Sequence, residues 1–379
     1  MTEYRRALAH EEADILDFIN MVFSQAHRPH DFAALLPKVY AHEGFSRLHS
    51  VAVRNERIRG TVAVLPLELQ VDQGCALKVG YVGSVSAHPA DRGEGHMKEL
   101  MDMTVRECER QGYDLLALGG QRQRYNYFGF ESGGGELKFL ITAANVRHSM
   151  RDVSKDAVRI REITDENDPV LEGVYRLCCR QAMTCVRSRE WFLDIMHSWN
   201  GQCYALEDMR SGGALMGYVY AKGDDVCELG LCDERRIREV IRAWMESRQK
   251  CWVYVPMHHR VRANFIKSFA EDFAFTDSLM LHVFNWRHTL ETLLSFKAGY
   301  QPLSSGTFVF EVEGAGRYEI CVRDHEVMVT DTQKSPDMCF TPQRAVEFFF
   351  SSFTPMMTAS PMLKSWLPVP FDILSADAF

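Results

Sequence analysis

The sequence predicts a mixed α/β protein with two related α/β layers followed by a smaller α+β lobe. Strands and helices alternate through the first part, a similar order of elements recurs in the second, and the last part combines helices with alternating strands. With 379 residues and 46% hydrophobic content, the chain exceeds the usual domain size of roughly 100 to 200 residues. We therefore expect three domains, at residues 1–147, 148–286 and 287–379.

The composition narrows the class of partner. A formal net charge of -8 argues against a nucleic-acid surface, which needs concentrated Lys and Arg, and is compatible with a cationic substrate. Eleven scattered cysteines, with no CxxC or HExxH, predict neither a disulfide framework nor a metal site and favour a reducing cytoplasm. The charged start "MTEYRRALAHEEADILDF" resembles no signal peptide, and no apolar run is long enough for a membrane span.

The elements of the first part follow from hydrophobic spacing. Residues 11–25 predict a helix, and residues 50–71 predict two strands joined by a polar turn at 54–57. Residues 77–87 form the next strand, and the helix after it ends near Gly112. Its apolar face carries Met97, Leu100, Met101, Thr104 and Cys108. A short buried strand "YDLLALGG", a short helix or turn "RQRYNYFGF" and a closing strand "GELKFLITAANV" complete this part.

The second part begins after a polar linker at residues 148–158. Helical segments at 169–198, a hairpin with a further strand, the amphipathic helix "DERRIREVIRAWMESRQ" and the buried strand "CWVYVPM" follow. In the third part, residues 287–296 are helical and three alternating strands precede a helix with Thr341 as N-cap and Pro342 in its first turn. The last residues are unusually apolar for a free tail.

The stretch "VGSVSAHPADRGEGHMKELM", residues 82–101, combines a strand, a proline and two glycines before a helix. The first N–H groups of a helix have no partners within it, and the helix dipole is positive there. Gly93 and Gly95 let the backbone approach an anion, and Arg92 can add a charged contact. The stretch therefore predicts a diphosphate site; a glycine-assisted strand-to-helix turn is the alternative.

This Pro-x-x-Arg-Gly-x-Gly run, in its order of strands, resembles the acetyl-CoA site of the GNAT N-acetyltransferases. The resemblance implies that residues 84–87 hold the pantetheine arm like an added strand and that the amides of residues 92–97 bind the diphosphate. Met97 stands where the family usually has a small residue. The implied cofactor-binding residues are Val85, Ser86, Ala87, Arg92, Gly93, Glu94, Gly95, His96, Met97, Gly120 and Gln121.

A second segment, "RYNYFGFE" at residues 124–131, resembles the Tyr-x-x-Phe-Gly-Phe motif of the same family. The resemblance implies that Tyr125 is the general acid that protonates the departing CoA thiolate. Core packing of Tyr125 beside Phe128 and Phe130 is the alternative. The strand at residues 78–87 carries no carboxylate, so another group must accept the proton of the amine.

The whole layout resembles the enhanced-intracellular-survival (Eis) acetyltransferases. In those proteins a GNAT domain is followed by a degenerate GNAT-like domain, a sterol-carrier-protein-like lobe and a terminal residue whose carboxylate enters the active site; here that residue is Phe379. A frayed terminus is the alternative. We also expect a β-bulge near residues 83–85 that exposes the Val85 N–H as an oxyanion donor.

The resemblance implies an N-acetyltransferase that moves an acetyl group from acetyl-CoA to a primary amine, and a homohexamer. Asp17 and Asp377 are candidate carboxylates for a cationic amine, each with a solvated surface charge as the alternative. Ala378 stands where well-known relatives carry an acidic residue, which weakens the expectation for aminoglycosides. A non-catalytic acyl-CoA or lipid-binding protein that uses the C-terminal lobe is the second functional hypothesis.

Overall fold

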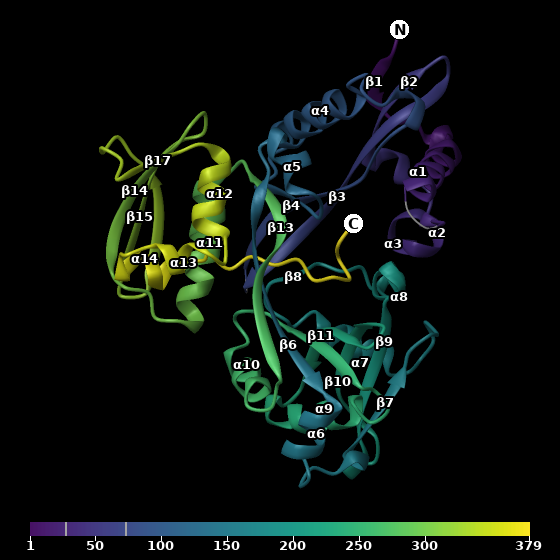
Figure 1. Ribbon diagram of the computed structural model, residues 1–379, viewed down its shortest axis with the longest axis vertical. Coiled ribbons are helices and arrows are strands. Elements are labelled where there is room, and N and C mark those ends of the chain that lie inside the picture. The colour runs from purple at the N-terminus through teal and green to yellow at the C-terminus, as the bar shows by residue number, and fades with distance from the viewer. Residues whose placement is uncertain (27–28, 73) are drawn as a thin grey trace. The chain divides into compact units, whose positions relative to one another are not determined.

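Figure 1 shows a computed structural model, which describes residues 1–26, 29–72 and 74–379. The chain forms two compact units. The first contains Met1–Gly134, Ser278–Phe371 and Phe379, and the second contains Gly135–Asp277 and Asp372–Ala378. Strands β6 (Glu131–Thr142) and β13 (Asp272–Val283) each have residues in both units. Within the described part of the chain, no helix is long and apolar enough to cross a membrane.

The first unit begins with a mixed sheet. Its order is β1-β2-β3-β4-β5-β13, in which β4 and β5 are parallel and the other neighbours are antiparallel. The first five strands are β1 (Glu3–Arg6), β2 (His49–Arg54), β3 (Arg57–Asp72), β4 (Cys75–Ala87) and β5 (Leu115–Leu118). The predicted hairpin turn at 54–57 is confirmed, because Arg54 pairs with Arg57 across it.

Helices lie on both faces of this sheet (Figure 1). One face carries α4 (His96–Arg110), and the other carries α1 (Glu12–Ala26), α2 (Phe32–Leu35) and α3 (Pro37–Tyr40). The face predicted for α4 is confirmed, since four of its five residues are fully buried and Met97 is half-buried. The helix ends at Arg110, and Gly112 follows with a φ of +70°, as the sequence predicts.

Strand β4 contains the predicted bulge. Ala63 of β3 pairs with Gly83, whereas Thr61 pairs with Ser86, so Ser84 and Val85 stand opposite a single residue of β3. Beyond this region, β4 and β5 also separate, because their parallel pairing runs only over Val79–Tyr81 and 115–117 in the described residues. The carboxyl end of β4 therefore has a free edge toward β5.

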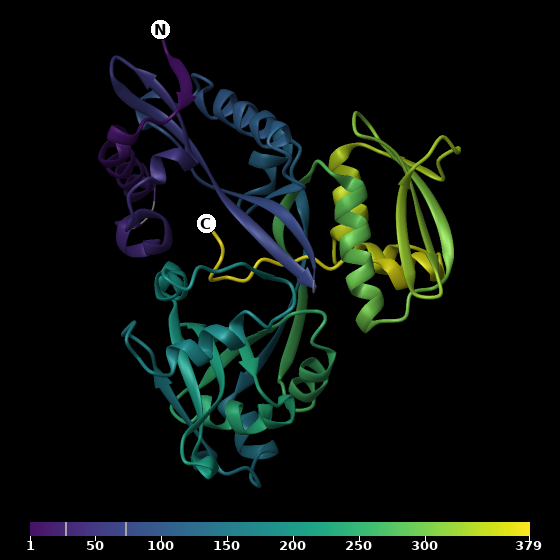
Figure 2. The same ribbon diagram turned by 180° about the vertical axis from the view of Figure 1, so that it is seen from behind.

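The remainder of the first unit is an α+β lobe (Figure 2). A four-stranded sheet of order β16-β15-β14-β17 packs against helices. The rings of Phe349 and Phe310 meet edge to face, with their centroids 4.8 Å apart. The expected N-cap is confirmed, because the Thr341 hydroxyl accepts a hydrogen bond from the Arg344 N–H. The elements are α11 (Trp286–Tyr300), β14 (Gly306–Val312), β15 (Gly316–Arg323), β16 (Glu326–Asp331), β17 (Met338–Phe340), α12 (Pro342–Phe350), α13 (Thr354–Met357) and α14 (Pro361–Trp366).

In the second unit the strand order of the same sheet that contains β1 to β5 is β6-β12-β11-β10-β9-β7, in which β11 and β12 are parallel. Its two faces bury different side chains: Val219 and Ala221 of β10 pack with α9, whereas Tyr218 and Tyr220 pack with α7 and α8. The elements are α6 (Ala143–Ser149), β7 (Val158–Glu162), α7 (Leu171–Cys178), β8 (Thr184–Cys185), α8 (Phe192–His197), β9 (Gln202–Asp208), β10 (Ala214–Lys222), β11 (Asp225–Leu231), α9 (Ile237–Trp244), β12 (Lys250–Val255) and α10 (Arg260–Lys267).

Candidate functional site

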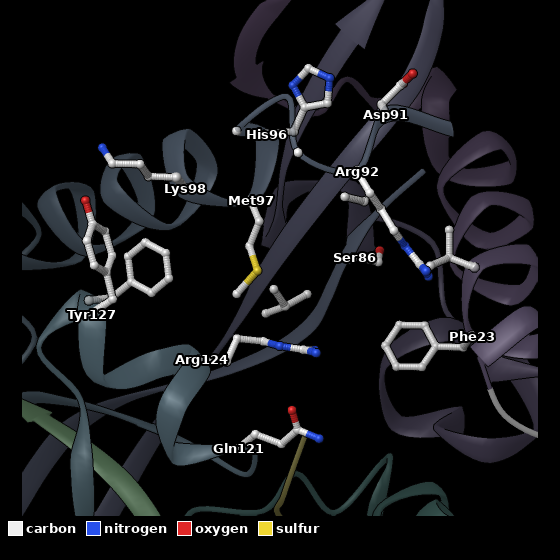
Figure 3. Close-up of a pocket in the computed structure, with 16 residues that line it drawn as sticks. Phe23, Ser86, Asp91, Arg92, His96, Met97, Lys98, Gln121, Arg124 and Tyr127 are labelled. Atoms are coloured by element: carbon white, nitrogen blue, oxygen red, sulfur yellow. The ribbon is translucent and has the colours of Figure 1, made fainter. Parts of the chain in front are cut away.

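A cleft of about 830 Å³ opens in the first unit between the end of β4, the start of α4, helix α1 and the short helix α5 (Arg122–Tyr125). Figure 3 shows the side chains around it. Nine of the eleven residues expected to bind a cofactor line this cleft: Val85, Ser86, Ala87, Arg92, Gly93, Gly95, His96, Met97 and Gln121. Glu94 and Gly120 do not line it.

The amino end of α4 forms one wall of the cleft. Gly93 and Gly95 have φ values of +91° and +85°, a region that residues with a Cβ rarely adopt. The first helical hydrogen bond joins the Glu99 N–H to the Gly95 carbonyl, so the N–H groups of residues 96–98 have no acceptor within the helix. With the positive end of the helix dipole, these amides make a site for an anion.

The loop before α4 is braced by a buried carboxylate. Asp91 is 4% exposed and pairs with both Arg54 and Arg59, and these arginines hold the pKa of Asp91 at about 2. Arg54 also reaches Glu94 at 2.6 Å, which explains why the Glu94 side chain is not part of the cleft wall. Ion pairs with Arg54 and Arg59 therefore hold the loop in place, and the charges of these two arginines are neutralised by the pairs.

Two other arginines keep their charge available. Arg92 and Arg124 are exposed, and their guanidinium groups point into the cleft from the loop before α4 and from α5 (Figure 3). Neither guanidinium group forms an ion pair or a hydrogen bond with another described residue. Sequence reasoning identified Arg92 and missed Arg124, although its place in the first turn after β5 puts it at the same sheet edge. The cleft thus combines free amides with two free cations.

Tyr125 lies outside the cleft wall. Its ring is 8% exposed and belongs to the core cluster that also contains Leu118 and Phe130, and burial raises the pKa of its hydroxyl. The ring covers Gly120 so closely that a Cβ there would lie 2.5 Å from Cε2. Gly120 is therefore needed to seat the ring. Like any tyrosine, Tyr125 carries its phenol proton at neutral pH, and the raised pKa makes the loss of that proton harder still.

The C-terminal residue lies against β4. Phe379 is 8% exposed, and its ring centroid is 6.2 Å from that of Tyr40. At Gly83, directly before the bulge, a Cβ would lie 2.7 Å from two ring atoms of Phe379 and 3.2 Å from its carboxyl carbon. The terminal carboxylate is therefore next to the bulge and to the strand end that lines the cleft.

Of the two candidate acidic residues, Asp377 differs from both sequence interpretations, and Asp17 agrees with the alternative of a solvated surface charge. Asp377 is neither a solvated surface charge nor a carboxylate free to bind a cation, because it is 4% exposed and pairs through both oxygens with the buried Arg187. The same guanidinium binds both carboxylate oxygens of Glu228. Asp17 is exposed on α1 and does not line the cleft. Over the described ranges, no cluster of three or more His, Cys, Asp or Glu side chains could hold a metal ion.

Known proteins are similar to this chain in the sequence of its first part and in its fold. Residues 3–133 match the family model of the acetyltransferase (GNAT) domain. A search of curated proteins finds no match to the chain. Three solved structures align over the full length of both chains: a probable N-acyltransferase from Enterococcus faecalis (TM-score 0.70, 14% identity), a GCN5-related N-acetyltransferase from Anabaena variabilis (0.69, 16%) and Eis1 from Mycobacterium abscessus (0.68, 14%).

The family match covers β1 to the start of β6, which is the part of the first unit that contains the cleft. GNAT domains use acetyl-CoA, and the free amides at α4 with the glycine backbone beside them fit its diphosphate. The similarity to Eis1 extends over the whole chain at the level of the fold. Residues 3–133 are therefore a GNAT acetyltransferase domain, in a chain whose fold is similar to that of Eis1.

Proposed function

We propose that this protein transfers an acetyl group from acetyl-CoA to a primary amine. The donor supplies an acetyl thioester, and the residues lining the cleft hold it. The amides at the start of α4, together with Arg92 and Arg124, bind the diphosphate, and the free edge of β4 at residues 85–87, which line the cleft, pairs with the pantetheine arm. Gln121 contacts the arm from the far wall of the cleft.

Three groups of this chain carry the chemistry in the proposal. The amine nitrogen forms a bond to the acetyl carbon and the carbon–sulfur bond breaks, while the Val85 N–H stabilises the negative charge on the carbonyl oxygen. Tyr125 donates its proton to the leaving sulfur, and the Phe379 carboxylate accepts the proton of the amine, which becomes acidic once the nitrogen has attacked. Exchange with water then restores both groups.

The observation that carries the proposal is the contact between Phe379 and Gly83. Chain termini are commonly frayed, yet here the last ring is buried and the terminal carboxyl carbon lies beside the bulge of β4. A carboxylate in that place supplies the proton acceptor that the strand itself lacks. The interpretation of Phe379 as a frayed end does not agree with this burial.

A pair of variants tests these roles. We expect Tyr125→Phe and deletion of Phe379 each to lower kcat by about 10² or more while acetyl-CoA binding changes little, as is typical for loss of an acid or base. Tyr113→Phe is the matched control, because Tyr113 is buried in the same core cluster but stands before β5, whereas Tyr125 belongs to α5, whose Arg124 lines the cleft. Turnover that survives deletion of Phe379 would remove the carboxylate from the mechanism.

We further propose that the chain is organised as in the Eis acetyltransferases. In this proposal residues 1–147 are the catalytic GNAT domain, residues 148–286 a degenerate GNAT-like domain, and residues 287–379 a sterol-carrier-protein-like lobe. The mixed sheet of the second unit, with helices on both faces and no Pro-x-x-Arg-Gly-x-Gly run, supports the degenerate assignment. A homohexamer is part of the same proposal, and sedimentation of the full chain measures it.

The acyl-CoA or lipid carrier is the competing proposal. The lobe's groove of about 880 Å³ is lined mainly by polar and charged residues, among them Glu291, Glu319, Arg323 and Lys334, which do not suit an acyl chain. A thiol-release assay with acetyl-CoA and a panel of polyamines, aminoglycosides and lysine peptides separates the proposals. Tight ligand binding with no thiol released by any amine would favour the carrier.

A further inference from the structure

A chain of buried polar side chains runs across the sheet to the bulge of β4. The Tyr40 hydroxyl lies 2.6 Å from Ser84 Oγ and 3.2 Å from His49 Nε2. His49 Nδ1 is 2.8 Å from Thr61 Oγ1, whose hydroxyl donates to the Ser50 carbonyl at 3.1 Å. All five residues are less than 10% exposed, so these bonds form away from solvent. The chain connects α3, β2, β3 and β4.

The hydrogen bonds in this chain have one consistent direction. Thr61 gives its only proton to the Ser50 carbonyl, so it must accept from His49, and Nδ1 of that ring carries the hydrogen. Burial, aided by the nearby charge of Arg6, lowers the pKa of His49 to about 3, so the ring is neutral and Nε2 is an acceptor. Tyr40 therefore donates to His49 and accepts from Ser84.

Ser84 is the residue that needs such support. Its φ is +50°, in the left-handed region that is unfavourable for residues other than glycine. This conformation coincides with the bulge, in which Ser84 and Val85 oppose a single residue of β3. In a regular strand the Val85 N–H would point toward one of the neighbouring strands, β3 or β5. In a bulge the extra residue is left unpaired. Val85 lines the donor cleft, so the bulge sets the wall of that cleft.

We propose that Tyr40 is a positioning residue, which holds Ser84 in its left-handed conformation through the Ser84 hydroxyl and so keeps the Val85 N–H directed at the reacting carbonyl. The inference rests on the proposed acetyl transfer and adds a residue that touches neither donor nor acceptor. The contacts of the Tyr40 hydroxyl carry the inference: it donates its proton to His49, and its oxygen accepts the hydrogen bond of the Ser84 hydroxyl. The aromatic ring of Tyr40 separately packs near Phe379.

Substitution of Ser84 by glycine separates the effect of the backbone conformation from the effect of the hydroxyl group. Ser84→Gly removes the hydroxyl but adopts a positive φ without strain, whereas Ser84→Ala removes the hydroxyl and keeps the strain. We expect Ser84→Ala and Tyr40→Phe each to lower kcat about tenfold, with little change in the KM for acetyl-CoA. Ser84→Gly should stay within about threefold of the wild type. Tyr40→Phe keeps the ring that packs near Phe379, so that contact is unchanged.

The double variant decides the question. If Tyr40 acts only by holding Ser84, then Tyr40→Phe should lower kcat less than about twofold in the Ser84→Gly background, although it lowers kcat about tenfold in the wild type. An equal loss of kcat in the two backgrounds, or a Ser84→Gly variant with a kcat as low as that of Ser84→Ala, would overturn the proposal. Thermal melts of all four proteins show whether a variant is folded.

The outcome is distinguishable from a failure of the proposed function. A wild-type protein that releases no thiol from acetyl-CoA with any amine rejects acetyl transfer, whatever the variants do. An active wild type whose Tyr40→Phe variant keeps full kcat rejects only the positioning role. Tyr113→Phe, another buried tyrosine of the domain, serves as the control for loss of a hydroxyl.

Discussion

Gly83→Ala is the substitution that most selectively disturbs the terminal carboxylate. Gly83 does not have a left-handed φ, so alanine can adopt its backbone conformation. The added methyl group would meet Phe379, with two ring atoms at 2.7 Å and the carboxyl carbon at 3.2 Å. Gly83 does not line the donor cleft, so the donor site itself should be unchanged.

The size of the effect follows from these distances. Ordinary van der Waals contact begins at 3.4 Å, so the ring must move by about 0.7 Å, which is 3.4 minus 2.7. A misplacement of about 1 Å in a reacting group can lower a rate by about 10². We therefore expect kcat to fall by about 10- to 100-fold. Overpacking of a core usually costs about 1–3 kcal/mol, and a chain end that can shift should cost about 1 kcal/mol of unfolding free energy.

Steady-state kinetics with acetyl-CoA and a polyamine measure this effect, and calorimetric titration measures acetyl-CoA binding. We expect the dissociation constant to stay within about twofold, because the cleft is unaltered. Gly299→Ala is the matched control: Gly299 lies in α11, has no left-handed φ, and has open space where its Cβ would be. A Gly83→Ala protein with wild-type kcat would refute the role assigned to Phe379.

Three further predictions concern the donor cleft and the stability of the two units. Arg124→Ala and Arg92→Ala should each raise the KM for acetyl-CoA about tenfold or more. The KM for acetyl-pantetheine, which has no diphosphate, should be unchanged. Equal effects on the KM of both donors would contradict a phosphate contact. Arg187→Ala should lower the unfolding free energy by about 3–5 kcal/mol in urea denaturation, because it leaves the buried carboxylates of Asp377 and Glu228 without their partner; a loss below about 1 kcal/mol would contradict this. Lys297 is buried against the carbonyls of Trp366 and Pro368, and burial lowers its pKa to about 7 from 10.5, so the unfolded chain binds more protons between these values. The unfolding free energy should therefore rise with pH across that window, and Lys297→Met should flatten the rise measured by denaturation at pH 7 and pH 9.

Local features of the fold were predictable because their causes are local. The glycines before α4, the buried face of that helix and the N-cap at Thr341 depend on residues within a few positions of one another. The bulge near residues 83–85 was also expected, although the family resemblance rather than any propensity pointed to it. Nine cofactor-binding candidates line one cleft for the same reason, since most of them are neighbours in the sequence.

Contacts between distant residues were not predictable from the sequence. Arg187 and Asp377 are 190 residues apart, and nothing in either segment identifies the other as its partner. The sequence interpretation of Asp377 failed because a single carboxylate near a chain end carries no sign of burial. The hydrogen-bond chain from Tyr40 to Thr61 was missed in the same way, because it needs three strands and a helix in place before its members meet.

Amine-dependent release of the CoA thiol by the full-length protein is the most direct test of the proposed function. We expect the wild type to release one thiol for each acetylated amine found by mass spectrometry, and Tyr125→Phe to do so about 10² more slowly at unchanged acetyl-CoA affinity. Acetyl-CoA that binds in the cleft but yields no thiol with polyamines, aminoglycosides or lysine peptides would contradict acetyl transfer by this protein.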